Sequence, residues 1–355
     1  MPELTLPARA GNALVSYVSY LGKFVYPVRL AVFYPHPGTA LPLWQVVTAS
    51  LVLCGISAGV FAWGRRQPYL LVGWLWYLGM LVPVIGLVQV GYQAMADRYT
   101  YLPQIGIYMM LAWGAVHLAG ASPVRRRACA VAACIVVALL SMRAWRQTSY
   151  WRDSEALWIH ALASTSRNYE AHHHLGKALA ARGESDAAIA QYRLALEIRP
   201  DFVEAHNNLA NVLVTRGQVD AAVDHYETAL QIKPDFVEAH NNLGLALAER
   251  GQAAAAIAHY RRALAIDGEF VEAHYNLANA LAGQGQDAEA IAHYEHAVML
   301  RPNFAAAHNN LGTLLAQRGD VEAAIAQYQK ALQIDPQFVS ARRNLAAVTA
   351  GRKGF

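Results

Sequence analysis

The first 152 residues of this sequence contain almost no acidic side chains. Glu3 and Asp97 are the only carboxylates among them, against twelve lysines and arginines, so this half carries a charge of +10 and residues 153–355 carry −6. A basic segment of this kind often binds nucleic acid. Here, however, the cations separate long uncharged runs, which favours a membrane partner and argues against nucleic acid.

Cysteine is scarce as well. Cys54, Cys129 and Cys134 all lie within apolar runs, so we interpret them as small core residues that indicate no redox compartment. The sequence has no Gly-rich phosphate loop, no Ser/His/Asp signature and no Cys₂His₂ spacing, and we predict no cofactor. The N-terminus also lacks the basic segment and adjoining apolar core of a cleavable signal peptide.

What the chain does have is a 34-residue repeat over residues 170–338, with two helical patterns in each unit. The first helices, which begin at residues 170, 204, 238, 272 and 306, read EAHHHLGKALAARG, EAHNNLANVLVTRG, EAHNNLGLALAERG, EAHYNLANALAGQG and AAHNNLGTLLAQRG. A period of this length predicts an α-solenoid. The glycine that ends each first helix suits a left-handed C-cap, and Asp201 with Glu204 suggests a capping box for the next helix.

The repeat resembles the tetratricopeptide repeat (TPR), because small residues, a tyrosine and a glycine recur at fixed positions in five successive units. The resemblance implies paired antiparallel helices that stack into a solenoid. One departure is histidine at the position where the family commonly has tryptophan. These histidines are His172, His206, His240, His274 and His308.

Four apolar runs precede the repeats, at residues 44–63, 69–90, 105–121 and 128–145, and Arg143 is the only charged residue in them. Their lengths suit membrane-spanning helices, so we predict a transmembrane region over residues 44–147. A buried soluble bundle is the alternative, but four such runs at this spacing disfavour it. The predicted fold class is therefore all-α, a multi-span transmembrane helical region followed by a TPR α-solenoid.

Three further segments complete the predicted domain organisation. Residues 1–43 predict an amphipathic helix at the membrane interface, near residues 12–34, and a loop, in preference to a further span. Residues 148–169 predict a degenerate docking helix, because Trp158 and Ala161 keep the register of the repeats. The five repeats follow at 170–338, and a capping helix and tail occupy 339–355.

The basic residues also predict an orientation. Arginines crowd two short hairpins, at residues 64–68 and 125–127, that contain no acids, and such hairpins usually face the cytoplasm. The repeats would then lie outside the cytoplasm. We expect a multi-pass protein of the bacterial inner membrane.

The segment NALVSYVSYLGKFVYPVRLAVFYPHPG at residues 12–38, PVIGLVQVGYQAMADRYTYLP at 83–103 and the repeats together resemble the C-terminal part of the transmembrane and TPR protein O-mannosyltransferases, bacterial type. The resemblance implies a multi-span transferase that uses a polyprenyl-phosphate sugar, with catalytic acids in an early extracytoplasmic loop. This chain has no such loop. Whether it is an enzyme is thus left open, no catalytic residue is predicted, and we expect the chain alone to transfer no sugar.

An asparagine recurs at one position of each first helix and predicts a ladder along the inner surface of the solenoid. Its amide can donate to a carbonyl and accept from an N–H, so the ladder suits an extended peptide, and it is similar to ladders in repeat-bearing O-GlcNAc transferases. Bonding between neighbouring helices is the alternative. The candidate groove residues are Asn208, Asn242, Asn276, Asn310, Asn344, Asn207, Asn241, Tyr275, Asn309, Asn211 and Asn279.

Two further candidates concern small ligands. Arg98, beside Asp97, is a possible contact for the phosphate of a membrane lipid or a lipid-linked sugar, although an ion pair that orders the loop is the alternative. The run His172–His173–His174 invites a metal hypothesis. Consecutive residues of a helix point about 100° apart, and equivalent histidines of adjacent units lie about 10 Å apart, too far to share zinc. We predict no metal.

Two functions follow from these observations. The first is a membrane-anchored TPR module that binds extended peptide or protein segments as the C-terminal portion of a glycosyltransferase-like protein of O-glycosylation. The alternative is a non-catalytic TPR scaffold for protein assembly outside the cytoplasm.

Overall fold

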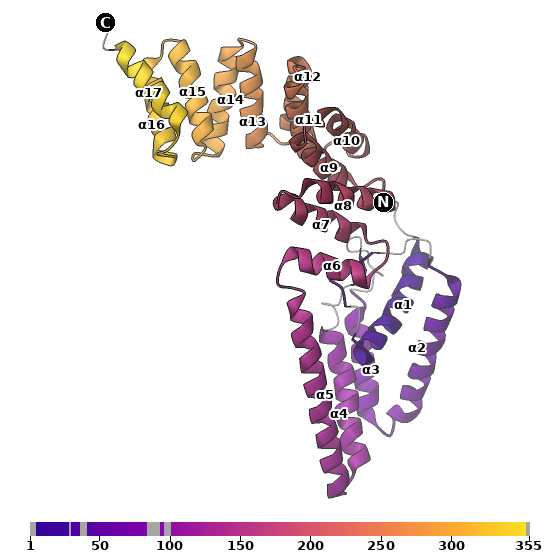
Figure 1. The fold of residues 1–355 in the computed structure, drawn as a ribbon. Coiled ribbons are helices and arrows are strands. Elements are labelled where there is room, and N and C mark those ends of the chain that lie inside the picture. Colours follow the sequence, from indigo (N-terminus) through magenta and orange to yellow (C-terminus); the bar gives the residue numbers. More distant parts are fainter. Residues whose placement is uncertain (1–4, 28–29, 36–40, 84–92, 96–100, 353–355) are drawn as a thin grey trace. The chain divides into compact units, whose positions relative to one another are not determined.

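The computed structural model describes residues 5–27, 30–35, 41–83, 93–95 and 101–352. They form an all-α protein apart from one short strand pair, in which β1 (Tyr34–Pro35) pairs antiparallel with β2 (Gln93–Met95). The chain divides into two compact units, residues 1–199 and 200–355, and Figure 1 shows the helices of each.

The first unit begins with five helices that pack consecutively. They are α1 (Leu6–Val25), α2 (Leu43–Gly64), α3 (Pro68–Leu81), α4 (Tyr101–Ala119) and α5 (Pro123–Ser149). Of these, α2, α4 and α5 are long and apolar enough to cross a membrane. Helix α3 is a shorter apolar helix, and the predicted span at 69–90 extends into residues 84–92, which lie outside the described part of the chain.

Two of the predicted boundaries move. The span expected at 128–145 is longer, because α5 begins at Pro123 behind the N-cap Ser122, whose hydroxyl accepts from the Arg125 N–H. The arginines expected to separate two spans thus form the first turns of a helix. Likewise, the helix expected near residues 12–34 ends at Val25, since Pro27 disfavours helical backbone at Tyr26, which has φ −134° and ψ 85°.

The core of this bundle is aromatic. Trp74, Tyr77 and Tyr20 are almost completely buried between α1, α2 and α3. Their polar atoms are bonded inside the bundle: the Tyr77 hydroxyl donates to the Tyr17 carbonyl over 2.7 Å, and Trp74 Nε1 donates to Ser57 Oγ over 2.9 Å. Helix α1, predicted to lie at a membrane interface, therefore packs one face into the bundle.

Helices α3 and α4 approach most closely at a pair of glycines. A Cβ added to Gly73 would lie 2.4 Å from the Gly106 carbonyl oxygen, and one added to Gly106 would lie 2.2 Å from the Gly73 carbonyl oxygen. Only residues without side chains fit at this crossing, as at many helix contacts in membrane proteins.

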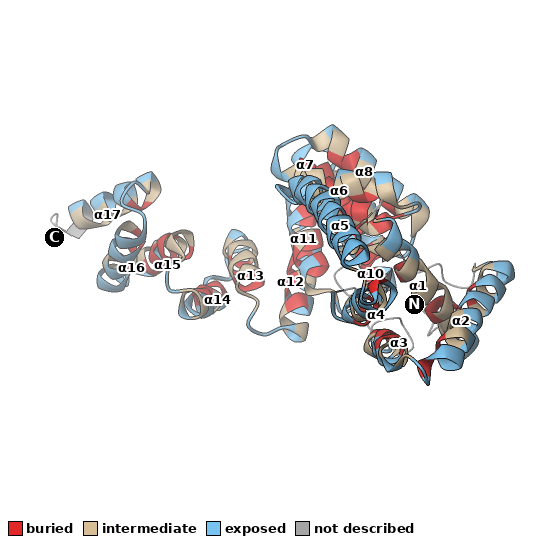
Figure 2. Ribbon diagram, turned by 90° about the horizontal axis from the view of Figure 1, so that it is seen from below, coloured by how far each residue is buried: buried red, intermediate tan, exposed pale blue. Residues whose placement is uncertain are grey.

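The solenoid helices begin within the first unit with α6 (Ser154–Ser164), α7 (Tyr169–Ala181) and α8 (Ser185–Ile198). The second unit continues the helix pairs with α9 (Val203–Thr215), α10 (Val219–Ile232), α11 (Val237–Glu249), α12 (Ala253–Ile266), α13 (Val271–Gly283), α14 (Asp287–Leu300), α15 (Ala305–Gln317), α16 (Val321–Ile334) and α17 (Val339–Arg352). In Figure 2, buried residues line one side of these helices.

Local sequence explains how each first helix ends. Gly217 has φ +72°, and the following Gln218 N–H donates to the Leu213 carbonyl over 2.9 Å, which closes the helix as a Schellman motif. The predicted glycine C-caps are confirmed. The predicted capping box is wrong, because α9 has Phe202 as its N-cap, without a side-chain cap bond. Phe202 is buried, and Asp201 lies one residue before the N-cap.

The first solenoid helices dock on the segment that precedes α2. Asn168 is 1% exposed and accepts from the Ala171 N–H at the start of α7, while its Nδ2 donates to the Phe33 carbonyl over 3.2 Å. His160 of α6 lies 3.0 Å from the Leu30 carbonyl and stacks on Tyr150 with ring centroids 3.8 Å apart. Specific polar contacts therefore join α6 and α7 to the helical bundle.

Candidate functional site

The asparagines of successive first helices are hydrogen-bonded to one another across the repeats of the second unit. Asn242 Nδ2 donates to Asn207 Oδ1, and Asn276 Nδ2 donates to Asn241 Oδ1, over 3.2 and 2.8 Å. Asn344 Nδ2 donates to Asn309 Oδ1 over 3.0 Å. These bonds join neighbouring helices, as the alternative interpretation of the ladder predicts. They run from Asn207 to Asn276 and from Asn279 to Asn344.

A second row lies three residues after the ladder position of each first helix, and it has asparagine in the second and fourth repeats. Asn211 Oδ1 accepts from both the Tyr226 hydroxyl and Asn242 Nδ2, over 2.5 and 3.2 Å. Asn279 Oδ1 accepts in the same way from Tyr294 and Asn310. Burial raises the pKa of Tyr294 to about 12, so its hydroxyl stays protonated as a donor. The equivalent residue of the third repeat is Leu245, a difference that the sequence contained and our reading of it missed.

Burial divides the predicted groove residues into two groups. Asn207, Asn241 and Asn309 are buried, at 4–7% exposed, and their oxygens hold the ladder residue of the next repeat. The others are half-buried and remain within reach of a ligand. These are Asn208, Asn242, Asn276, Asn310, Asn344, Asn211, Asn279 and Tyr275.

Pairs of histidines lie behind the ladder, an arrangement that sequence reasoning missed. His240 Nε2 donates to the Pro234 carbonyl over 3.1 Å, which leaves its Nδ1 to accept from His259 Nδ1 at 3.1 Å. His206 with His225 and His274 with His293 repeat this geometry. Burial lowers the pKa of His240, His259, His274 and His293. A glutamine takes the second histidine's place in the first and fifth units, as Gln191 and Gln327.

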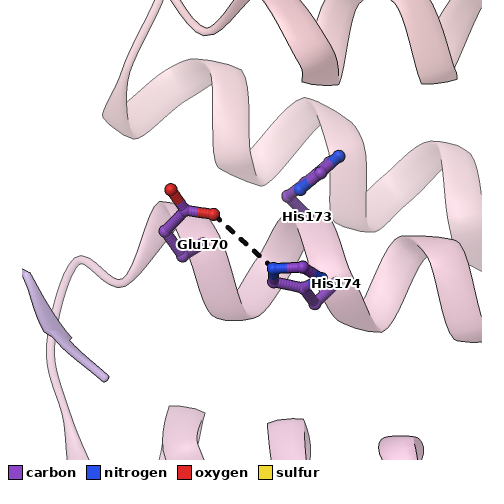
Figure 3. Close-up of side chains that lie close together, drawn as sticks. All are labelled: Glu170, His173 and His174. Carbon is purple, nitrogen blue, oxygen red and sulfur yellow. Dashed lines mark ion pairs between the residues drawn. The ribbon is translucent and has the colours of Figure 1, made fainter. Parts of the chain in front are cut away.

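Three potential metal ligands lie together on α7, as Figure 3 shows. Glu170, His173 and His174 are at positions i, i+3 and i+4, and one ligand atom from each lies within 4.8 Å of the others. Burial, then His174 and Lys177, lower the pKa of His173 to about 3. The sequence-based prediction of no metal compared the histidines only with one another and overlooked Glu170, although its spacing was visible.

A pocket of about 390 Å³ lies where α5 leaves the bundle. Its lining is mostly apolar, and Arg143 is its charged residue, with an Nη1 that donates to the Pro27 carbonyl over 3.3 Å. Arg98, the predicted phosphate contact, lies outside the described residues. The remaining lining residues are Leu30, Tyr101, Leu140, Ala144, Gln147, Thr148 and Trp151.

The repeats match a family model described as TPR repeat in five overlapping segments. These segments are residues 176–215, 210–249, 244–285, 279–317 and 313–350. Residues 176–350 are thus TPR repeats, and the predicted all-α solenoid is confirmed.

Curated relatives extend this similarity to a group of transferases. The chain is 30% identical to the human protein O-mannosyl-transferase TMTC4 over 162 residues, 42% of this chain and 21% of that protein. It is 27% identical to Tmtc2 of Drosophila melanogaster over 106 residues, 30% of this chain and 11% of that protein. The matched region is therefore a small part of each relative.

Solved structures with similar helices are TPR proteins. They include YrrB, described as having an unusual peptide-binding site, at 24% identity and a TM-score of 0.43 over 52% of this chain and 96% of that one. PilF of Pseudomonas aeruginosa is 23% identical, with a TM-score of 0.47 over 52% and 90% of the two chains.

Proposed function

We propose that this chain is a membrane-anchored TPR module whose ladder binds extended peptide or protein segments, as the C-terminal portion of a glycosyltransferase-like protein. The hydrogen-bonded asparagine network carries the proposal. Because Nδ2 of Asn242 is held by Asn207 and Asn211, its carboxamide is oriented before any ligand arrives. Preorganisation of this kind lowers the entropy cost of binding.

The network also determines which atoms a ligand would meet. A carboxamide oxygen has two lone pairs, and Asn242 Oδ1 accepts one bond from Asn241 Nδ2, so one lone pair is left for a peptide N–H. The oxygens of Asn211 and Asn279 each accept two bonds, which leaves their Nδ2 groups to donate to peptide carbonyls. Repeats spaced by about 10 Å match about three residues of extended peptide.

The bundle supports membrane anchoring and an orientation. Gln67 Nε2 lies 3.1 Å from His117 Nε2, so the α2–α3 and α4–α5 hairpins are at one end of the bundle (Figure 1). That end holds Arg65, Arg66 and Arg125–Arg127, and it would face the cytoplasm. The opposite end, with Trp145 and Trp151, would face outward together with the solenoid.

The pocket at this outward end suits the phosphate of a membrane lipid or a lipid-linked sugar. Arg143 supplies the guanidinium that such a phosphate needs, and the apolar lining would contact acyl or prenyl chains. In this respect Arg143 joins Arg98 as a candidate.

Peptide binding is tested with the full chain in lipid nanodiscs and fluorescent extended peptides. Replacing Asn208, Asn242, Asn276 and Asn310 together by alanine should weaken binding at least about 30-fold, since each neutral hydrogen bond contributes about 0.5–1.5 kcal/mol. Helical circular dichroism should be unchanged. Because alanine also removes bonds between repeats, Asn211→Leu with Asn279→Leu is the matched variant.

The leucine variant copies Leu245 of the third repeat and removes two donors from the surface, so it should keep the fold and weaken binding about 5-fold or more. Full affinity in both variants would contradict a peptide-binding ladder and leave the scaffold function, in which partners contact another face.

A further inference from the structure

The first repeat differs from the others at one face of its first helix. The second and third repeats have Glu204, Asn207 and Asn208, and Glu238, Asn241 and Asn242, at positions where the first has Glu170, His173 and His174. Two amides are thus replaced by two imidazoles beside a carboxylate. Imidazole is a far better ligand than carboxamide for first-row transition metals.

Helix geometry brings these three groups to one side of α7. Residues i, i+3 and i+4 share a face, and His174 Nε2 lies 3.8 Å from Glu170 Oε2. The three ligand atoms lie within 4.8 Å of one another. Donor atoms about 3.3 Å apart surround a tetrahedral zinc ion with bonds of 2.0–2.1 Å, so side-chain rotations that bring the donors closer by up to about 1.5 Å would complete the geometry.

The surroundings fix the two imidazoles. The His174 ring stacks on Trp158 of α6, with centroids 4.4 Å apart and planes 9° apart. His173 is 6% exposed and packs against the ring of Tyr192. Lys177, three residues after His174, is a cation on the same helix and limits the affinity for a metal ion.

We propose that Glu170, His173 and His174 form a binding site for a divalent transition metal ion of the zinc class. Two nitrogens and one carboxylate oxygen are a ligand set that zinc accepts, with water in the fourth position. All three ligands come from α7, so the ion would not cross-link helices. It would instead occupy the first unit's ladder position, where His174 replaces asparagine.

The test is calorimetric titration of zinc into the full chain, purified without a polyhistidine tag and held in detergent. Wild type should bind one zinc ion per chain. His173→Asn with His174→Asn should lower the affinity at least 10-fold, since even loss of an outer-shell partner costs 10–100-fold. This variant recreates EAHNNLG, which folds as α11 in the third repeat, so misfolding does not confound it. Glu170→Gln should also weaken binding.

The histidine pairs of the other repeats supply the matched control. His225→Gln, His259→Gln and His293→Gln copy the His–Gln pairs of the first and fifth units and should leave zinc binding unchanged. Cobalt(II) added in place of zinc should give the visible absorption of a tetrahedral site in wild type. Absence of zinc binding in wild type, or loss of binding only in the triple glutamine variant, would overturn the site.

Discussion

Helices α5 and α13 both carry apolar side chains, but these side chains face different surroundings. Every residue of α5, all of which the structure describes, is at least partly exposed, including Val137 at 62%. In α13, Leu277 and Leu281 are completely buried, and the polar residues other than His274 are at least partly exposed. Figure 2 shows the contrast between the two helices.

The difference shows what each region uses to exclude water. The solenoid buries its apolar face against neighbouring repeats, as nearest-neighbour stacking requires. The bundle leaves large apolar side chains outward on α2, α4 and α5 and buries aromatic residues with satisfied polar atoms inside. An exposed apolar surface on this scale in water would aggregate. In the proposed function, lipid takes the place around the bundle that neighbouring repeats take in the solenoid.

Both the bundle and the solenoid contain glycines in close contacts, so a glycine substitution in each region tests the comparison. The largest effect is expected in the bundle, where backbone faces backbone. Gly106→Ala pushes a Cβ against the Gly73 carbonyl oxygen, and neither helix can yield as a side chain can, so we expect a loss of about 3 kcal/mol. Denaturant unfolding in detergent, followed by tryptophan fluorescence, measures it. Gly79→Ala has nothing within 4 Å and should not destabilise, and equal losses in both variants would contradict the close crossing.

In the solenoid, the corresponding glycine contact is with a side chain and not with backbone. A Cβ on Gly244 would lie 2.5 Å from the Tyr260 ring, which can shift at a cost, so Gly244→Ala should destabilise by about 2 kcal/mol. Gly283→Ala, in α13 with open space around it, should instead stabilise by about 0.5–1 kcal/mol because alanine favours helix. Thermal unfolding of the full chain compares them. If both Gly244→Ala and Gly283→Ala lowered stability, helix propensity and the space around the added Cβ would not explain the effects of these substitutions.

The contact between the regions depends on Asn168. Asn168→Ala removes the cap of α7 and the bond to the Phe33 carbonyl, and should cost about 1–3 kcal/mol. Asn168→Asp keeps an oxygen for the Ala171 N–H but cannot donate, so it should cost less and should specifically increase amide hydrogen exchange near residues 30–35. Both variants lose the bond to the Phe33 carbonyl, so unchanged exchange near residues 30–35 in both of them would show that this bond contributes nothing.

The smallest effect is a pH dependence confined to the solenoid. The folded pKa of His240, His259, His274 and His293 is lowered, so the unfolded chain binds more protons and stability falls as pH drops below about 6.5. His293 faces His274, Glu289, His296 and Arg261, and His240 faces Arg262. His259→Gln with His293→Gln should reduce the fall in Tm between pH 7.5 and 5.5, and the remaining fall belongs to groups such as His173 and His174, whose pKa values burial also lowers. A fall of the same size in the variant would assign it to other groups.

Repeat chemistry made the solenoid predictable. The 34-residue period predicts the glycine C-caps, the buried tyrosines and the ladder position, because the same residue types recur at these positions in each unit. The Asp201–Glu204 capping box failed since Phe202 gains more by burial at the N-cap. In the bundle, uncharged length predicted the positions of α2, α4 and α5, but the Gly73–Gly106 crossing depends on tertiary packing that no period encodes.

Site residues divide in the same way. The sequence placed the asparagines on one surface but did not distinguish buried Asn241 from half-buried Asn242, because the two are adjacent in one Asn–Asn pair. The histidine pairs were missed since their partners, such as His206 and His225, come from different helices. Glu170 was missed because the sequence-based prediction compared the three consecutive histidines only with other histidines.

Reporter fusions test the central claim most directly, namely that the apolar helices cross a membrane and hold the solenoid outside the cytoplasm. Alkaline phosphatase, which is active only outside the cytoplasm, is fused after Phe355 in one strain and within the Gly64–Pro68 hairpin in another. The account predicts activity for the fusion after Phe355 and none for the hairpin fusion. Activity only from the hairpin fusion, or recovery of the protein in the soluble fraction, would contradict it.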